Sequence, residues 1–95
     1  MESIDHIAIQ VSDIKQASSY YLDTFDCNLI YQDDSWALIK FANINLALVL
    51  PTEHPPHIAI TDEDLVGNDI LHHRDGSKSL YQHDPFGNVI ERIKY

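Results

Sequence analysis

The tetrapeptide His-Ile-Ala-Ile occurs twice in this 95-residue chain, at positions 6–9 and 57–60. In each copy a histidine precedes a short β-branched and apolar run, which is typical of a buried strand. Such a match within so short a chain is improbable by chance. It predicts two copies of one supersecondary unit, each opening on a strand that carries its histidine at the same register.

The first half of the chain is expected to fold as β-α-β-β-β. Alternation across residues 4–11 predicts a strand whose more apolar side faces a helix, which leaves His6 and Gln10 on the opposite side. An N-cap at residue 12 or 13 and apolar residues at spacings of three and four predict a helix from residue 14 to about residue 25. Further strands are expected at 29–32, 36–41 and 44–50.

The second half is expected to repeat this order with a shortened helix. After a proline-rich connector and a strand at 57–61, only residues 63–66 are available for a helix before Gly67. Strands are then expected at 69–73, 79–83 and 89–94, with turns at 74–76 and 84–88. The chain is therefore interpreted as one domain, residues 1–95, with modules at 1–50 and 57–95 joined by the connector 51–56.

Charge and composition exclude several classes of partner. Fifteen acidic and six basic residues give a formal net charge of -9, which disfavours binding to nucleic acid or to a membrane surface. The single cysteine, Cys27, cannot form an internal disulfide, and the sequence shows no signal peptide and no apolar run long enough to span a bilayer. A cytoplasmic protein is expected.

The proposed duplication brings together three side chains that could bind a metal. If the first and last strands of both modules line one concave side, then His6, His57 and Glu91 meet there. Aligning residues 45–48 with 88–91 assigns Leu48 to the fourth symmetric place. Two imidazoles and one carboxylate are a set used for divalent Fe, Mn, Ni, Co or Zn. Alternatively, His6 is a hydrogen-bonded strand histidine, and Glu91 pairs with a neighbouring Arg or Lys at an edge.

Other polar residues are weaker candidates. Gln10, Tyr81 and His83 are possible substrate contacts, although Tyr81 also suits a packed position. His72 and His73 are adjacent on an expected strand, so they cannot both face the concave side. Asp5 precedes His6 and is expected on the opposite face, which makes it a weak candidate to support that histidine.

Several segments resemble the vicinal oxygen chelate superfamily, which includes glyoxalase I, bleomycin- and fosfomycin-resistance proteins and extradiol dioxygenases. The resemblance covers nearly the whole chain, and it rests on residues 5–9, 19–25, 56–60 and 83–91. The last segment resembles the family's Asp-Pro-Asp-Gly-Asn…Glu hairpin. The resemblance implies an α+β fold of paired βαβββ modules. It also implies a divalent metal held by His6, His57 and Glu91, whose chemistry involves substrate oxygens that chelate the metal.

The chain departs from the family pattern at three points. Leu48 stands where glyoxalase-type members have a fourth ligand, which leaves a three-ligand, dioxygenase-like set. The truncated second helix leaves a sheet face uncovered, so a homodimer that covers this face is expected. No cluster of Lys and Arg is evident near the expected metal site, which argues against fosfomycin-type activity.

Three hypotheses for function follow. The first is a divalent-metal-dependent enzyme that acts on a small oxygenated molecule by lyase, isomerase or extradiol-type dioxygenase chemistry. The alternative is a metal-free protein that binds and sequesters a small molecule, as bleomycin-resistance members do. The third is a structural or interaction domain that retains the ligand residues without their function.

Overall fold

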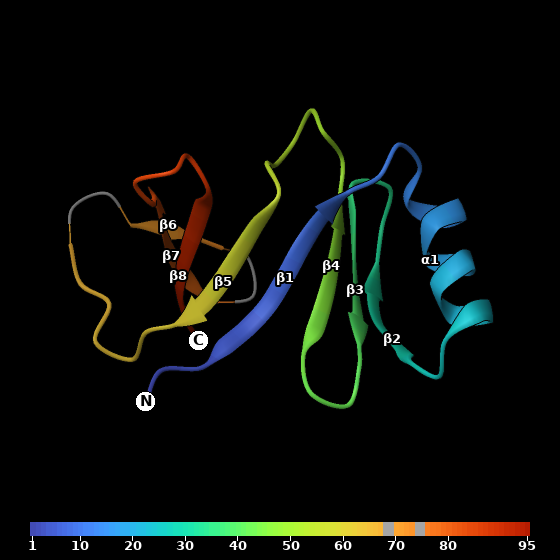
Figure 1. Cartoon of the computed structure of the whole chain (residues 1–95), viewed down its shortest axis with the longest axis horizontal. Coiled ribbons are helices and arrows are strands. Elements are labelled where there is room, and N and C mark those ends of the chain that lie inside the picture. Colours follow the sequence, from blue (N-terminus) through green and yellow to red (C-terminus); the bar gives the residue numbers. More distant parts are fainter. Residues whose placement is uncertain (68–69, 74–75) are drawn as a thin grey trace.

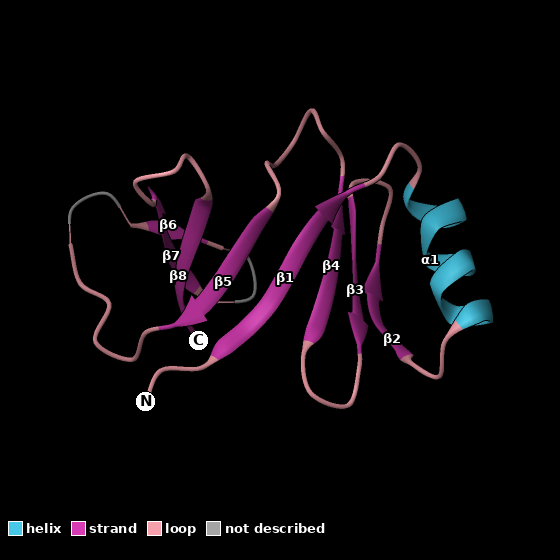
Figure 2. Ribbon diagram, in the orientation of Figure 1, coloured by secondary structure: helices cyan, strands magenta, loops and turns pink. Residues whose placement is uncertain are grey.

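The chain forms one mixed sheet with a helix on one face. The computed structural model describes residues 1–67, 70–73 and 76–95 (Figure 1). The strands in the described residues are β1 (Ile4–Gln10), β2 (Asn28–Gln32), β3 (Trp36–Lys40), β4 (Asn45–Val49), β5 (His57–Thr61), β6 (Leu71–His72), β7 (Lys78–His83) and β8 (Val89–Lys94), and the helix is α1 (Ile14–Thr24). Their order across the sheet is β2-β3-β4-β1-β5-β8-β7-β6. This arrangement confirms the α+β fold of two paired modules, although within the described residues only the first module contains a helix (Figure 2).

The repeated tetrapeptides pair with each other at the centre of the sheet. β1 and β5 are antiparallel, with Ile7 opposite Ile58, Ala8 opposite His57 and His6 opposite Ala59. Each strand also pairs in parallel with the last strand of its own half, β1 with β4 and β5 with β8. The two halves are therefore related by a pseudo-twofold axis that passes near the pair Ile7 and Ile58.

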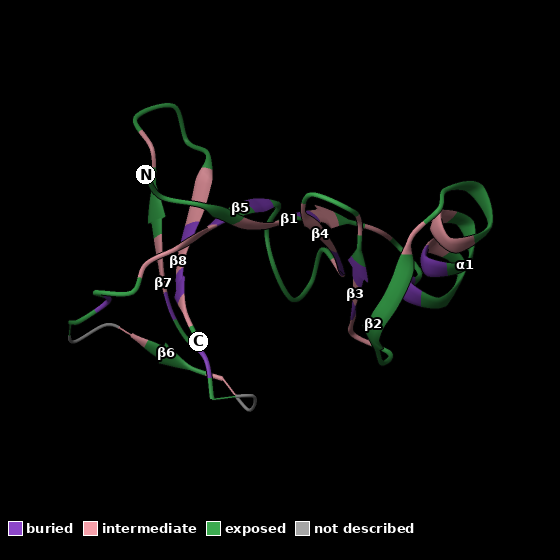
Figure 3. Ribbon diagram, turned by 90° about the horizontal axis from the view of Figure 1, so that it is seen from below, coloured by how far each residue is buried: buried purple, intermediate pink, exposed green. Residues whose placement is uncertain are grey.

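The helix covers only the first module. α1 contacts β2, β3 and β4, and its buried residue Ile14 packs in a cluster with Ala37, Ile39 and Leu48. The inner strands carry most of the buried residues, whereas β2 is exposed along its length (Figure 3). α1 has 11 residues, and no helix in the described part of the chain is long and apolar enough to cross a membrane.

The expected helix at residues 63–66 is not formed. Asp62 Oδ1 accepts a hydrogen bond from the amide of Asp64, and the amide of Leu65 donates to the Asp62 carbonyl, so the segment is a turn. The truncation of the second helix is therefore complete, because too few residues precede Gly67 for a helical hydrogen-bond ladder. Of the strand expected at 69–73 and the turn expected at 74–76, residues 69, 74 and 75 lie outside the described residues.

The hairpin between β7 and β8 is fixed by one aspartate. Asp84 Oδ1 accepts hydrogen bonds from the amides of Phe86 and Asn88, at 2.8 and 2.9 Å. Gly87 adopts a φ of 87°, a conformation that residues with a Cβ rarely adopt. This turn sets the register of β8, the strand that carries Glu91.

Replacement of Asp13 by alanine is expected to lower the free energy of unfolding by about 1 kcal/mol. Asp13 is the N-cap of α1, and its side chain accepts a hydrogen bond from the amide of Gln16 at 2.8 Å. Alanine leaves this amide without a protein partner. Urea unfolding followed by circular dichroism measures the change. Asp23→Ala removes a charge elsewhere on the helix, and an equal effect of both variants would contradict the capping role.

Candidate metal centre

Three strands carry the candidate ligands to one face of the sheet. His6 comes from β1, His57 from β5 and Glu91 from β8, and we call these three residues the trio. Pairing places Ala59 between His6 on one side and Glu91 on the other. Ala59 is fully buried, and its small side chain leaves room above it for the larger ones. The fold therefore brings together His6 and Glu91, which lie 85 positions apart in the sequence.

The trio is compact and shielded from water. Glu91 Oε1 lies 3.2 Å from Nε2 of His6 and 3.2 Å from Nε2 of His57. The imidazole rings meet edge to face, with centroids 5.6 Å apart. His57 and Glu91 are buried, and His6 is half-buried.

The geometry and chemistry of the trio fit a divalent metal. One potential ligand atom from each residue lies within 4.8 Å of the other two. Ligand atoms about 2.1 Å from one ion and at right angles lie about 3 Å apart, which matches the nitrogen-to-oxygen distances in the trio. A carboxylate with two imidazoles is also a donor set that divalent iron, manganese, nickel, cobalt and zinc accept.

Both imidazoles are held through Nδ1, which leaves Nε2 directed at the centre of the trio. His6 Nδ1 is hydrogen-bonded to Asp5 Oδ2 at 2.8 Å, and His57 Nδ1 to the carbonyl oxygen of Pro55 at 2.9 Å. A neutral imidazole that donates from Nδ1 keeps a lone pair on Nε2, which is the atom a metal needs.

The expectation that Asp5 faces away from His6 is wrong. The pairing of β1 with β5 shifts register between Ile4 and His6, which inserts one extra residue at Asp5 as a β-bulge. A bulge breaks the strict alternation of side chains and redirects the inserted residue. Asp5 therefore reaches the ring of its neighbour and also accepts a hydrogen bond from the hydroxyl of Tyr95 at 2.6 Å.

Charge is concentrated around His6. Burial lowers the pKa of His6, but the hydrogen bonds and negative charges of Asp5 and Glu91 outweigh it and raise the pKa from 6.5 to about 9. Burial would raise the pKa of Glu91, but the two histidines outweigh this effect and lower it. The hydrogen bond from His6 is the largest cause of the lowered pKa of Asp5. In the metal-free protein at neutral pH, His6 is an imidazolium between two carboxylates.

The free energy of unfolding of the metal-free protein is expected to fall as pH rises from 6.5 to about 9. In this window the folded protein keeps a proton on His6 that the unfolded chain releases, so stability is lost as pH approaches the folded pKa. The full shift corresponds to about 3 kcal/mol. Urea unfolding with a chelator present measures it. An equally steep fall in His6→Gln would contradict this assignment.

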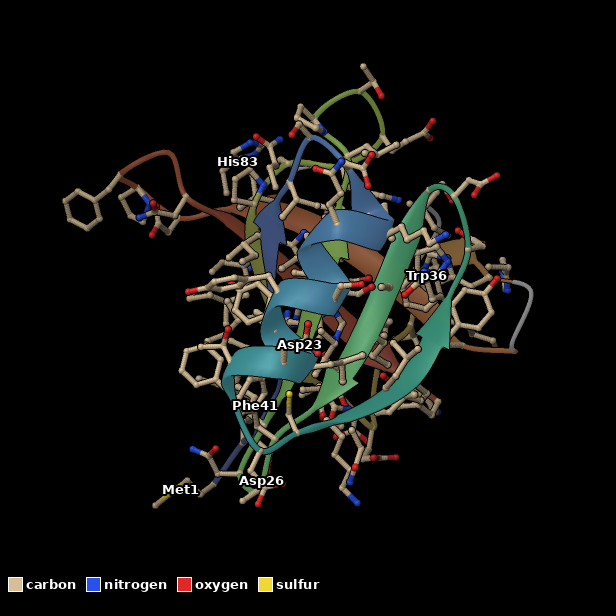
Figure 4. All side chains as sticks on the ribbon, turned by 90° about the vertical axis from the view of Figure 1, so that its right-hand side faces the viewer. Met1, Asp23, Asp26, Trp36, Phe41 and His83 are labelled. Carbon is tan, nitrogen blue, oxygen red and sulfur yellow. The ribbon has the colours of Figure 1, made fainter. Side chains whose placement is uncertain are left out.

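The other residues singled out in the sequence lie at different distances from the trio. Tyr81 pairs with Glu91 across β7 and β8, and its ring packs edge to face on His57 with centroids 5.4 Å apart. Burial, followed by the charge of Glu91, raises the pKa of Tyr81. Gln10 is exposed and donates to the carbonyl oxygen of His54. His83 is exposed at the end of β7 (Figure 4).

His73 lies closer to the trio than the sequence indicated. Its Nε2 lies 4.0 Å from Glu91 Oε2 and 2.6 Å from Ser79 Oγ, with which it forms a hydrogen bond. The adjacent His72 is exposed in β6, where it pairs with Lys78. The position of His73 follows from pairing between β6 and β7, because its amide donates to the carbonyl of Ser77.

The fourth symmetric place belongs to Ala47, and its assignment to Leu48 is wrong. Ala8 pairs with Ala47 just as its repeat, Ala59, pairs with Glu91. Leu48 faces the opposite side, where it is fully buried against α1. Matching Asn45 with Asn88 misled the alignment, because Asn88 belongs to the turn held by Asp84.

The fold and the site define an α+β protein of two paired modules, the first of them βαβββ, with three side chains on the shared sheet that could hold a metal. A family model described as the Glyoxalase/Bleomycin resistance protein/Dioxygenase superfamily matches residues 3–83. The chain belongs to this superfamily.

Solved structures support the same fold. A hypothetical protein from Bacillus halodurans has a TM-score of 0.81 and 18% identity, over 99% of this chain and 94% of that chain. Methylmalonyl-CoA epimerase in complex with methylmalonyl-CoA and NH4+ has a TM-score of 0.79 and 17% identity, over 99% of this chain and 94% of that chain. Methylmalonyl-CoA epimerase from Mycobacterium tuberculosis has a TM-score of 0.74 and 19% identity, over 96% of this chain and 86% of that chain. At these identities the likeness establishes the fold alone. No curated protein sequence matches the chain.

Proposed function

We propose that this protein is a divalent-metal-dependent enzyme that acts on a small oxygenated molecule. The observation that carries the proposal is the trio, in which two Nε2 atoms and a carboxylate oxygen converge while both Nδ1 atoms are already hydrogen-bonded. Three protein ligands leave positions for water or substrate. A bound divalent metal would supply Lewis-acid polarisation of a substrate oxygen, or redox chemistry if it is iron or manganese.

The substrate that we propose is a small molecule with oxygen atoms that can bind a metal. The net charge of -9 opposes large polyanions, and acyl-CoA thioesters carry several phosphate charges. Methylmalonyl-CoA, the ligand of one similar structure, is therefore disfavoured as a substrate, and it serves as a comparison compound in assays. We assign possible substrate contacts to Tyr81, which borders His57 and Glu91, and more weakly to Gln10 and His83.

Metal content tests the proposal directly. Protein purified without chelator or affinity tag is titrated with Fe²⁺, Mn²⁺, Ni²⁺, Co²⁺ and Zn²⁺ and compared with His57→Ala. Near-stoichiometric metal that is lost in His57→Ala but kept in His83→Ala, which removes an exposed histidine, supports a site at the trio. Iron or manganese then directs assays to dioxygen chemistry, and nickel, cobalt or zinc to isomerase or lyase chemistry. Wild type that stays empty with every metal refutes the proposal.

One observation favours a second function, metal-free binding and sequestration of a small molecule. The polar atoms of the trio are satisfied without a metal, and no buried side-chain nitrogen or oxygen in the described residues lacks a hydrogen-bond partner. Such a cluster is stable as a hydrogen-bonded network. Ligand binding that is unchanged by chelator and by His57→Ala would support this second function.

We also propose that a second copy of the chain covers the sheet face opposite the trio. Ile7, Ile58 and Ile90 form a row on this face, and Ile7 and Ile58 are each 38% exposed. Exposed apolar rows of this kind favour association. Light scattering after gel filtration should give a dimer for wild type and a monomer for Ile58→Glu, and a monomeric wild type refutes the dimer.

The free Cys27 suits a reducing compartment, so we place the function in the cytoplasm.

A further inference from the structure

The two histidines of the trio differ in what supports them. His57 is held by a main-chain carbonyl, that of Pro55, so its partner is neutral and belongs to the backbone. His6 is held by the carboxylate of Asp5. A carboxylate behind an imidazole orients the ring and increases its basicity, and such partners alter metal affinity by about 10–100-fold. The strands that carry His6 and His57 are related by pseudo-twofold symmetry, but the hydrogen-bond partners of the two Nδ1 atoms are not.

Asp5 is itself held from the other end of the chain. The hydroxyl of Tyr95 donates to the same oxygen, Oδ2, that accepts from His6. Tyr95 directly follows β8, which carries Glu91, and β1 and β8 are the two neighbours of β5. The hydrogen bonds from Tyr95 through Asp5 to His6 thus connect the strands of two trio residues across β5. We call Tyr95 and Asp5 the relay.

The relay depends on an interruption of regular strand pairing. Side chains of a regular strand alternate between faces, and the bulge at Asp5 interrupts this alternation where Asp5 and His6 meet. Asp5 is also partly shielded, with 20% of its side chain exposed. A carboxylate in such surroundings forms stronger hydrogen bonds than one in water.

We propose that Asp5, supported by Tyr95, is a positioning residue that keeps Nε2 of His6 available as a metal ligand and sets the affinity of the trio for metal. This inference rests on the proposed metal-dependent function. Asp5 acts on the metal through His6, and the hydrogen bond from Tyr95 acts through Asp5. Tyr95 is 66% exposed, so its contribution is expected to be the smaller one.

The experiment uses the full-length chain with Asp5→Ala, Asp5→Asn, Tyr95→Phe and the double variant Asp5→Ala/Tyr95→Phe. Affinity for Co²⁺ and Zn²⁺ is measured by competition with a chelator. Asp5→Ala is expected to weaken binding by about 10–100-fold. Asp5→Asn should recover part of this loss, because its amide oxygen still accepts a hydrogen bond. Asp23→Ala, which removes an equal charge from α1, is the control (Figure 4).

The double variant tests the order of the relay. If Tyr95 acts only through Asp5, Tyr95→Phe weakens binding by a few-fold in wild type and has no further effect in Asp5→Ala. Additive losses overturn the relay. Equal affinities of wild type and Asp5→Ala overturn the positioning role and leave the proposed function intact.

A measurement on metal-free protein separates the two proposals. Long-range ¹H–¹⁵N spectra above pH 9 report which ring nitrogen of neutral His6 carries the proton. Wild type is expected to carry it on Nδ1, and Asp5→Ala to shift it toward Nε2. An unchanged tautomer in Asp5→Ala overturns the positioning role. If wild type binds no metal, the proposed function fails, and a tautomer that shifts still supports the positioning of His6 by Asp5.

Discussion

Leu48→Glu is expected to leave the chain unfolded or nearly so, whereas Ala47→Glu is expected to fold. Leu48 is fully buried in the cluster formed with Ile14, Ala37 and Ile39. A carboxylate at this position would be packed against apolar side chains, and an unpaired buried charge costs several kcal/mol. That penalty is comparable with the total stability of a domain this small, which is on the order of 5–15 kcal/mol. Circular dichroism and urea unfolding measure the loss.

The variant Ala47→Glu introduces the same charge at the neighbouring residue, and we expect it to strengthen metal binding. Ala47 pairs with Ala8, which in turn pairs with His57, so a carboxylate at 47 occupies the place symmetric to Glu91. Ala47→Glu is expected to destabilise the metal-free protein, because Ala47 is 4% exposed. It should increase metal affinity by about tenfold, which corresponds to about 1.4 kcal/mol.

The pair of variants also tests the register of the sheet. If Leu48→Glu folds and binds metal more tightly while Ala47→Glu unfolds, the register of β4 against β1 is wrong. Leu48→Met is the matched control, since a volume-conserving apolar change at the same buried site usually costs less than about 1.5 kcal/mol.

Glu91→Gln is expected to weaken metal binding by more than about 100-fold, the upper value typical of residues that only support a ligand. Glutamine keeps the shape of the side chain but removes the charge that attracts the cation. In the metal-free protein the variant should also lose about 2 kcal/mol at pH 6, because the His6 imidazolium loses one of its charged hydrogen-bond partners. Competition titration and urea unfolding measure the two effects.

The loss of stability in Glu91→Gln should shrink as pH rises toward 9, where His6 is partly neutral even in wild type. Gln82→Glu, a change on the neighbouring strand at an exposed position, serves as a control for general charge effects. Metal affinity equal to that of wild type in Glu91→Gln would contradict a role for Glu91 as a ligand.

The sequence was sufficient to predict the strands and the meeting of the trio. The repeat at His6 and His57 specified two equivalent strands, and the turn signal at Asp84 specified the hairpin that carries Glu91. These predictions depend on local patterns, namely a run of apolar residues and a turn motif. The long helical pattern from residue 14 was predicted to within one residue for the same reason.

Apart from the helix that does not form at residues 63–66, the features that the sequence could not reveal depend on strand register. A single inserted residue moves Asp5 to the face of His6, and nothing in residues 4–6 distinguishes a bulged strand from a regular one. The alignment of the two modules was also wrong by one residue in β4. Because side chains alternate along a strand, this error assigned Leu48 instead of Ala47 to the place symmetric to Glu91. His73 was missed because its distance from Glu91 is set by pairing across two hairpins rather than by spacing along the chain.

The position of β1 in the sheet has a consequence for folding. β1 is the first strand made, yet its neighbours are β4 and β5, and the last trio residue arrives on β8. Such distant pairings close late, because loop closure must precede them. Partly folded chains therefore lack the complete trio. If the trio binds a metal, metal capture during refolding would report the moment at which β1, β5 and β8 are all paired.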